Sequence, residues 1–201
     1  EEGIAWALTT TALIPMELGR PEEAGPMLEE AEALHRKAGN SGGIRRVLHL
    51  RGLQAAAVGY VDGGRRLFRD AAELSRQEDD TFSAVSALHS LGDVELGAGE
   101  IYAAEAAYRG GLRSAWDTSA DRLVCYCLAG LAAASAARGD AGRAALIWGF
   151  AEAYEERLRG MLATAQARVA VASDELVGTL RSAAAGAGVD VIGTPEEFGR
   201  L

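Results

Sequence analysis

The feature that most constrains the fold is a glycine that recurs every 40 residues, at Gly19, Gly59, Gly99 and Gly139. Five further columns of leucine, small residues and large residues keep the same register. They are Leu8, Leu48, Leu88 and Leu128; Ala12, Gly52, Gly92 and Ala132; Ala24, Gly64, Ala104 and Ala144; Leu28, Phe68, Tyr108 and Trp148; and Ala31, Ala71, Gly111 and Ala151. A fixed period of this length predicts an array of stacked structural repeats.

Each repeat predicts a pair of helices joined by a turn. Leu48 and Gly52 are four residues apart and share one helix face, and Gly59 can end that helix in the left-handed conformation. Gly64 and Phe68 then begin a second helix, in which the small residue allows close approach and the large residue fills the space between the helices. Such a hairpin cannot bury its own apolar faces alone, so stacking completes the core. We expect the extra residues of the long period to lengthen the helices and the connections Ala38–Gly43 and Asp117–Asp121.

Composition and charge agree with an all-α protein and exclude several partner classes. Apolar residues make up 49% of the 201 residues and aromatics only 6%, with alanine, the best helix former, dominating. The net charge of −9 argues against direct binding of nucleic acid or an anionic membrane. Cys125 and Cys127 point to different faces of a helix, which disfavours a disulfide and favours a reducing cytoplasm. No apolar run is long enough for a membrane span.

A family resemblance becomes specific in the third unit. Leu88, Leu91, Gly92, Gly99, Ala104 and Tyr108 resemble the tetratricopeptide signature, an L-x-x-L-G start, a turn glycine and A-x-x-x-aromatic. The resemblance covers about residues 4–158, although the standard repeat has ~34 residues. It implies a right-handed α-solenoid of four hairpins over residues 1–160. Residues 161–201 are then a degenerate repeat with a C-terminal capping helix.

Residues 127–156, C-L-A-G-L-A-A-A-S-A-A-R-G-D-A-G-R-A-A-L-I-W-G-F-A-E-A-Y-E-E, are similar to the last repeats of large actinobacterial regulators. These LuxR-type and antibiotic-regulatory proteins join a DNA-binding domain, a STAND-class NTPase and a C-terminal tetratricopeptide array. The resemblance implies a sensor or interaction arm of a transcriptional regulator, in contact with upstream domains of the same chain. Because the sequence starts at Glu1 without methionine, we expect a piece of a longer polypeptide.

The sequence offers little catalytic chemistry. Lys37, the only lysine, is followed by alanine and cannot complete a phosphate-binding loop. His89 and Asp93 share a helix face, and His49 precedes His89 by one period, but a metal site usually needs more ligands at tighter spacing. We therefore predict no enzyme, no cofactor and no metal, and we expect His35 to lie on the surface.

The remaining candidate is the concave groove, which in tetratricopeptide arrays is lined by the first helix of each unit. Three columns are expected to face it: Trp6, Arg46, Ser86 and Tyr126; Thr9, His49, His89 and Ala129; and Leu13, Leu53, Asp93 and Ala133. We select Trp6, Arg46, His49, His89, Asp93 and Tyr126, because aromatic and arginine side chains dominate binding energy at interfaces. The predicted ligand is a protein, peptide or small effector. Two alternatives are a structural oligomerisation scaffold and a solenoid that binds a small molecule directly.

Overall fold

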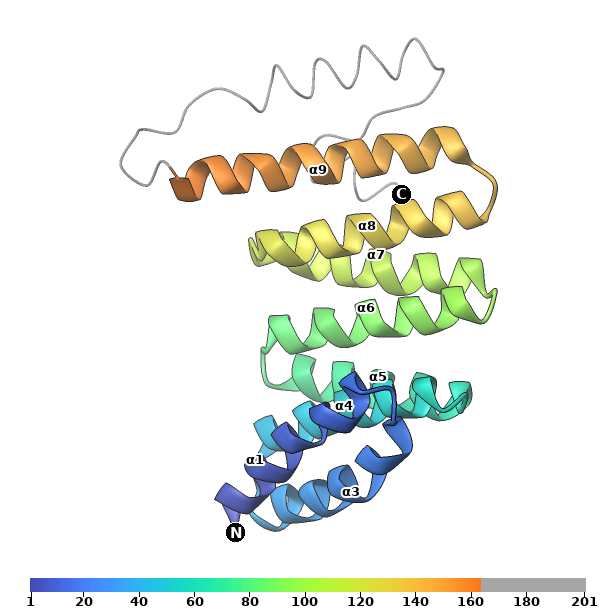
Figure 1. Cartoon of the computed structure of the whole chain (residues 1–201). Coiled ribbons are helices and arrows are strands. Elements are labelled where there is room, and N and C mark those ends of the chain that lie inside the picture. The colour runs from blue at the N-terminus through green and yellow to red at the C-terminus, as the bar shows by residue number, and fades with distance from the viewer. Residues whose placement is uncertain (164–201) are drawn as a thin grey trace. The chain divides into compact units, whose positions relative to one another are not determined.

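The computed structural model describes residues 1–163, with side chains described up to Leu158, and this part of the chain consists of helices and turns. The chain divides into two compact units, Glu1–Gly99 and Glu100–Leu201. The first contains α1 (Glu2–Thr11), α2 (Leu13–Glu17), α3 (Pro21–Lys37), α4 (Ser41–Ala57), α5 (Val61–Gln77) and α6 (Thr81–Gly97). The second contains α7 (Ile101–Asp117), α8 (Asp121–Ala137) and α9 (Ala141–Ala163). In each unit, consecutive helices from α3 to α6 and from α7 to α9 pack side by side (Figure 1). The all-helical prediction is confirmed for the described residues.

The helices are joined by short turns that use left-handed backbone. Gly19, Gly59, Gly99 and Gly139 have φ angles of 72°, 82°, 79° and 87°, as predicted for glycines that end a helix. Each helix from α3 to α8 has 17 residues, and only three residues separate it from the next helix within its unit. The prediction of longer connections at 38–43 and 117–121 is therefore wrong, because α4 and α8 start at Ser41 and Asp121 and take up those residues.

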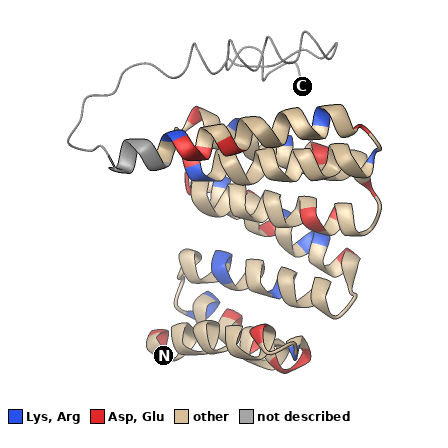
Figure 2. Cartoon of the chain, turned by 45° about the horizontal axis from the view of Figure 1, so that its top comes forward, with Lys and Arg blue, Asp and Glu red and all other residues tan. Residues whose placement is uncertain are grey.

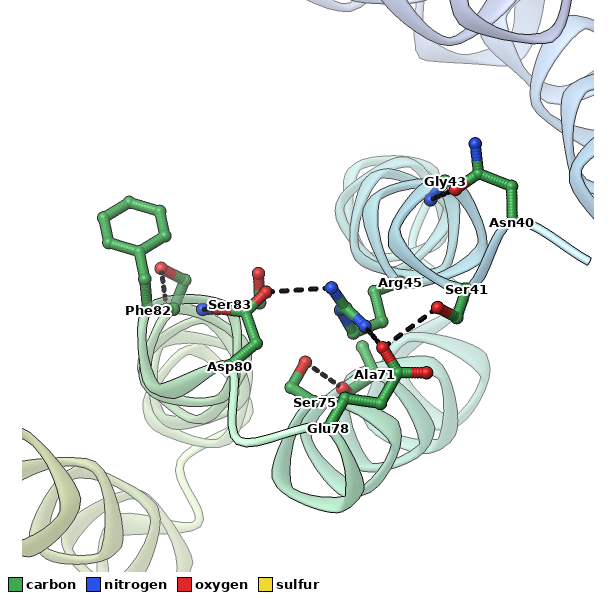
Figure 3. Close-up of polar contacts among 11 residues, drawn as sticks. Asn40, Ser41, Gly43, Arg45, Ala71, Ser75, Glu78, Asp80, Phe82 and Ser83 are labelled. Carbon is green, nitrogen blue, oxygen red and sulfur yellow. Dashed lines mark hydrogen bonds and ion pairs between the residues drawn. The ribbon is translucent and has the colours of Figure 1, made fainter. Parts of the chain in front are cut away.

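The turn between α5 and α6 has no glycine and is held by side chains instead. Asp79 has a φ of 55°, a conformation that costs a residue with a Cβ roughly 1 kcal/mol or more. Arg45 of α4 binds the carboxylates on both sides of it, contacting Glu78 and reaching Asp80 at 3.1 Å (Figure 3). Asp80 also caps α6 by accepting a hydrogen bond from the Ser83 amide at 3.0 Å. These contacts compensate for the unfavourable backbone.

The core follows the predicted columns in the first three units. Leu28, Phe68 and Tyr108 are almost completely buried. A Cβ atom added to Gly52 would come within 2.7 Å of the Phe68 ring. A Cβ atom added to Gly130 would likewise come within 2.4 Å of the Tyr108 ring. Glycine is thus needed on the facing helix because the aromatic ring fills the space of a side chain.

The fourth member of this column departs from the prediction. Trp148 of α9 is 51% exposed and does not fill a space between helices. Ala151, one turn further along α9, is 7% exposed, so one face of α9 is buried while Trp148 lies outside it. The expectation that Trp148 is a core residue is wrong for the described structure, in which α9 packs on α8.

Buried carboxylates connect neighbouring helices by ion pairs. Glu32 of α3 contacts Arg51 of α4, and Glu95 of α6 binds Arg65 of α5 at 2.7 Å. Burial alone would raise the pKa of Glu32, but hydrogen bonds and charges from Arg51 and Arg36 hold it below its ordinary value. Removing one partner would leave a charge without compensation, so these pairs favour one helix register.

Acidic and basic residues are interspersed along the helices of both units rather than gathered in one basic stripe (Figure 2). Among the described helices, none combines the length and the hydropathy needed to cross a bilayer. The predicted cap at residues 161–201 lies outside the described residues from 164 onwards, and α9 itself continues to Ala163.

Candidate functional site

Four of the six predicted site residues lie on two helices of the first unit. Arg46 and His49 belong to α4, and His89 and Asp93 belong to α6. Helices α4 and α6 contact each other directly, and each of them also packs on α5. Arg46 and Asp93 are more exposed than His49 and His89, which are partly buried. We call this region, together with Leu53 and Ser90, the α4–α6 surface.

His49 connects the two helices. Its Nε2 lies 3.5 Å from the Ser90 hydroxyl, and its ring meets the Phe68 ring edge to face with centroids 5.4 Å apart. Burial, with a smaller effect of the Arg46 charge, lowers the pKa of His49 to about 4. The imidazole is therefore neutral near pH 7 and offers one donor and one acceptor nitrogen.

His89 and Asp93 form a pair on the exposed side of α6. The His89 Nδ1 lies 3.2 Å from an Asp93 carboxylate oxygen, as expected for residues one helical turn apart. The sequence analysis put His49 and His89 in one column that faces the groove; the hydrogen-bond contact of His49 with α6 is with Ser90, one residue further along that helix. Ser90 was missed because the period aligns residues in units and does not set the offset between packed helices.

An open hollow of about 430 Å³ lies beside these residues, at the carboxyl ends of α4 and α6. Asp93 and Ser90 contribute its polar side-chain atoms. The other lining residues are aliphatic or glycine: Leu53, Ala56, Val61, Val94, Gly97 and Ala98. A concave, mainly apolar surface with a few polar groups is the usual form of a ligand site, and this volume falls in the common range of roughly 300–1,000 Å³.

Trp6 lies elsewhere in the first unit, on α1, and is 41% exposed. Its ring contacts the edge of His35, with centroids 4.9 Å apart. The expectation that His35 is on the surface is wrong: it is fully buried, and its Nε2 lies 3.2 Å from the Thr9 hydroxyl. Thr9, expected to face the groove, is likewise buried. Gly43 permits this packing, because a Cβ there would come within 2.1 Å of His35 Nδ1.

Tyr126 belongs to α8 in the second unit and is 53% exposed. Neighbouring Cys125 is partly buried, and burial, reinforced by Glu155 and Asp121, raises its pKa to about 11. A thiol that stays protonated at neutral pH is a poor nucleophile. Neither Cys125 nor Cys127 forms a disulfide within the described residues.

Within residues whose placement is described, no group of three or more His, Cys, Asp or Glu side chains could hold a metal ion. His89 and Asp93 therefore form a polar pair rather than part of a larger ligand set in this part of the chain. What the α4–α6 surface offers chemically is a neutral imidazole, a hydroxyl and a carboxylate next to an apolar hollow.

Comparison with known proteins does not assign this chain to a family. No protein-family model matches it, and a search of curated proteins returned no significant match.

Proposed function

We propose that the chain is a binding module that takes a peptide or small effector on the α4–α6 surface. The observation that carries the proposal is the hollow of about 430 Å³, with Ser90 and Asp93 at its edge and aliphatic side chains elsewhere. An apolar group of the ligand would enter the hollow, and a hydrogen-bond donor or a cation beside it would meet Asp93. Arg46, on α4 two turns before Leu53, would contact a more distant part of the ligand.

The helix arrangement supports a right-handed α-solenoid of the tetratricopeptide type as the finer description of the fold. In such an array α4 and α6 are the first helices of consecutive hairpins and line the same side. The helices α3–α8 have equal length and equal turns, as expected for a repeated hairpin.

We further propose that this chain is the sensor arm of a multidomain transcriptional regulator. Occupancy of the α4–α6 surface would shift the equilibrium between two arrangements of the longer polypeptide. The size of that shift is limited by the difference between the ligand's affinities for the two arrangements. The resemblance of residues 127–156 to actinobacterial regulators supports this role.

The test uses Gly97, which lines the hollow and has open space where a Cβ would be. Gly97→Leu adds an apolar side chain at a lining position of the hollow whose Cβ meets nothing within 4 Å. Leucine also favours a helix over glycine, so we expect the variant to fold. The matched control is Gly142→Leu on α9, where a Cβ also meets nothing within 4 Å.

A panel of sugars, nucleotides, amino acids and short peptides is screened by thermal shift and confirmed by calorimetry. A ligand present at a hundred times its dissociation constant should add ~2.7 kcal/mol of stability to the wild-type chain. We expect Gly97→Leu to abolish this gain and Gly142→Leu to retain it. A ligand that binds both variants equally well would show that the hollow is not its site.

A further inference from the structure

The first two helices expose a mainly apolar stripe on the side opposite to the core. Its five residues follow each other at spacings of three and four: Ile4, Ala7, Thr11, Ile14 and Leu18. The three large apolar members are 56%, 55% and 61% exposed. Pro15 interrupts the helix at Ala12, but Ala12 keeps right-handed helical angles (φ −60°, ψ −19°). We call these five residues the α1–α2 stripe.

The opposite face of the same segment is already used. Ala5, Thr9, Ala12 and Pro15 are buried, and Ala12 belongs to a core cluster with Leu28 of α3. A helical segment that is mainly apolar on both faces is typical of an element packed on two sides. The described residues of this chain cover only one of them.

The residues one and two periods after Ile4 and Ala7 show how buried these positions are in later helices. One period after Ala7 stands Val47 of α4, and two periods after it stands Ala87 of α6; both are completely buried. Ala84 of α6 lies two periods after Ile4 and is 1% exposed. Helices α4 and α6 pack on the helices that precede them, α3 and α5. Ile4 and Ala7 of the α1–α2 stripe therefore occupy positions of a helix-packing face, whereas Val58 and Ala98, the equivalents of Leu18, are exposed.

We propose that the α1–α2 stripe is a self-association surface, on which the same stripe of a second copy packs antiparallel about a two-fold axis at Thr11. Antiparallel pairing places Ile4 beside Leu18 of the second copy and Ala7 beside its Ile14. Large residues then meet at the two ends, and a small residue faces a large one between them. An isologous interface requires such self-complementarity.

The polar group of the stripe is compatible with this pairing. A threonine hydroxyl is both a donor and an acceptor, so the two Thr11 hydroxyls that meet on the axis can hydrogen-bond to each other. A hydroxyl buried against an apolar partner would instead lose its hydrogen bonds to water, which is unfavourable. Thr11 therefore favours the register in which it faces its own copy.

Charge favours a second copy over a charged partner. Residues 3–16 include no Asp, Glu, Lys or Arg, so two stripes meet without repulsion although the chain has a net charge of −9. Glu1 and Arg20 flank the stripe at its opposite ends, and their side chains are 62% and 51% exposed. Antiparallel pairing brings each Glu1, which is paired with Lys37 in its own chain, towards the Arg20 of the second copy, which is paired with Glu23.

The size of the stripe sets the expected strength. From Ile4 to Leu18 it extends for roughly 21 Å along the helical axis, at 1.5 Å per residue. An interface one helix wide and this long is smaller than the ~800 Å² per partner of a standard protein interface. We therefore expect a reversible dimer that dissociates on dilution in the micromolar range.

The experiment is sedimentation velocity on the 201-residue chain across a wide concentration series. The wild type should shift from monomer to dimer with increasing concentration, and Ile14→Glu should remain monomeric. The control is Phe82→Glu, which places the same charge on another large side chain, 64% exposed on α6, and should still dimerise. Circular dichroism verifies that all three fold.

A cross-linking measurement tests the axis. Under mild oxidation Thr11→Cys should give a covalent dimer, because residues on a two-fold axis bring their Cα atoms within the ~7 Å that a disulfide spans. Phe82→Cys should not, and the native cysteines are present in both variants. A monomer at every concentration would overturn the proposal. Dimerisation that survives Ile14→Glu would overturn it in favour of another face.

Discussion

Acidification should destabilise the first unit through His49. Its pKa is about 4 in the folded chain, against an ordinary value near 6.5, because the ring is buried against Phe68 and close to Arg46. As pH falls below about 6.5, His49 becomes protonated in the unfolded state, whereas in the folded state it stays neutral until about pH 4. Folding free energy is therefore lost between these two values, and no further loss from His49 follows below them.

The magnitude follows from the two pKa values. At about pH 5 the unfolded imidazole is almost fully protonated and the folded one almost fully neutral, which costs about 2 kcal/mol relative to neutral pH; the full shift corresponds to about 3 kcal/mol. His35 is also buried and its pKa is lowered, so the wild type should lose more than His49 alone explains. A comparison with His49→Gln, which keeps a polar group near Ser90, isolates the contribution of His49.

The assay is urea unfolding of both proteins at about pH 7 and about pH 5, with the histidine resonances titrated by NMR. We expect the free energy of unfolding to fall by about 2 kcal/mol more in the wild type than in His49→Gln. Equal losses, or a His49 resonance that titrates near its ordinary value, would refute the buried and neutral imidazole.

Two further predictions concern the helix packing and the turns. Gly130→Ala should lower the free energy of unfolding by about 1–3 kcal/mol, because the new Cβ would come within 2.4 Å of the Tyr108 ring. Thermal or urea unfolding measures this change. Unchanged stability would show that α7 and α8 do not approach each other this closely. Asp79→Gly should raise the melting temperature because it relieves a φ of 55°, whereas Gly99→Ala, at a φ of 79°, should lower it; opposite signs would contradict the left-handed turns.

The turn glycines were predictable because their role depends on the local backbone alone. Gly59 and Gly99 each end a 17-residue helix with a positive φ, as their recurrence indicated. The recurrence of glycine did not predict the left-handed turn at Asp79, because that turn has no glycine and is held by a long-range contact instead. Arg45 lies more than thirty residues earlier in the chain, and nothing in the local pattern connects it with Glu78.

The large-residue column shows a different limit. Leu28, Phe68 and Tyr108 are almost completely buried, but Trp148 shares their place in the period and is half-exposed. Periodicity identifies equivalent positions; burial depends also on which elements are present around them. Within the described residues α9 packs on α8, and it keeps the pattern of the column without burying Trp148.

For the candidate site, the period predicted only that certain residues lie on neighbouring helices. Arg46, His49, His89 and Asp93 do lie on two contacting helices, α4 and α6, and their role as a site stays a prediction. Ser90 and the hollow were not found, because they depend on the offset between α4 and α6. His35 was misplaced since a histidine in a polar helix reads as exposed, while Gly43 on the facing helix makes room for it.

The α4–α6 surface and the α1–α2 stripe differ in what they can recognise. The first combines Ser90 and Asp93 with an apolar hollow, so a ligand gains or loses hydrogen bonds according to its structure, which allows discrimination. The second has the Thr11 hydroxyl at its centre and no charged group between residues 3 and 16, so it discriminates mainly by shape. A sensor needs the first property, whereas association with an identical copy needs only the second. Our proposal therefore assigns selective ligand binding to the α4–α6 surface, and a variant such as Ile14→Glu should leave that binding intact.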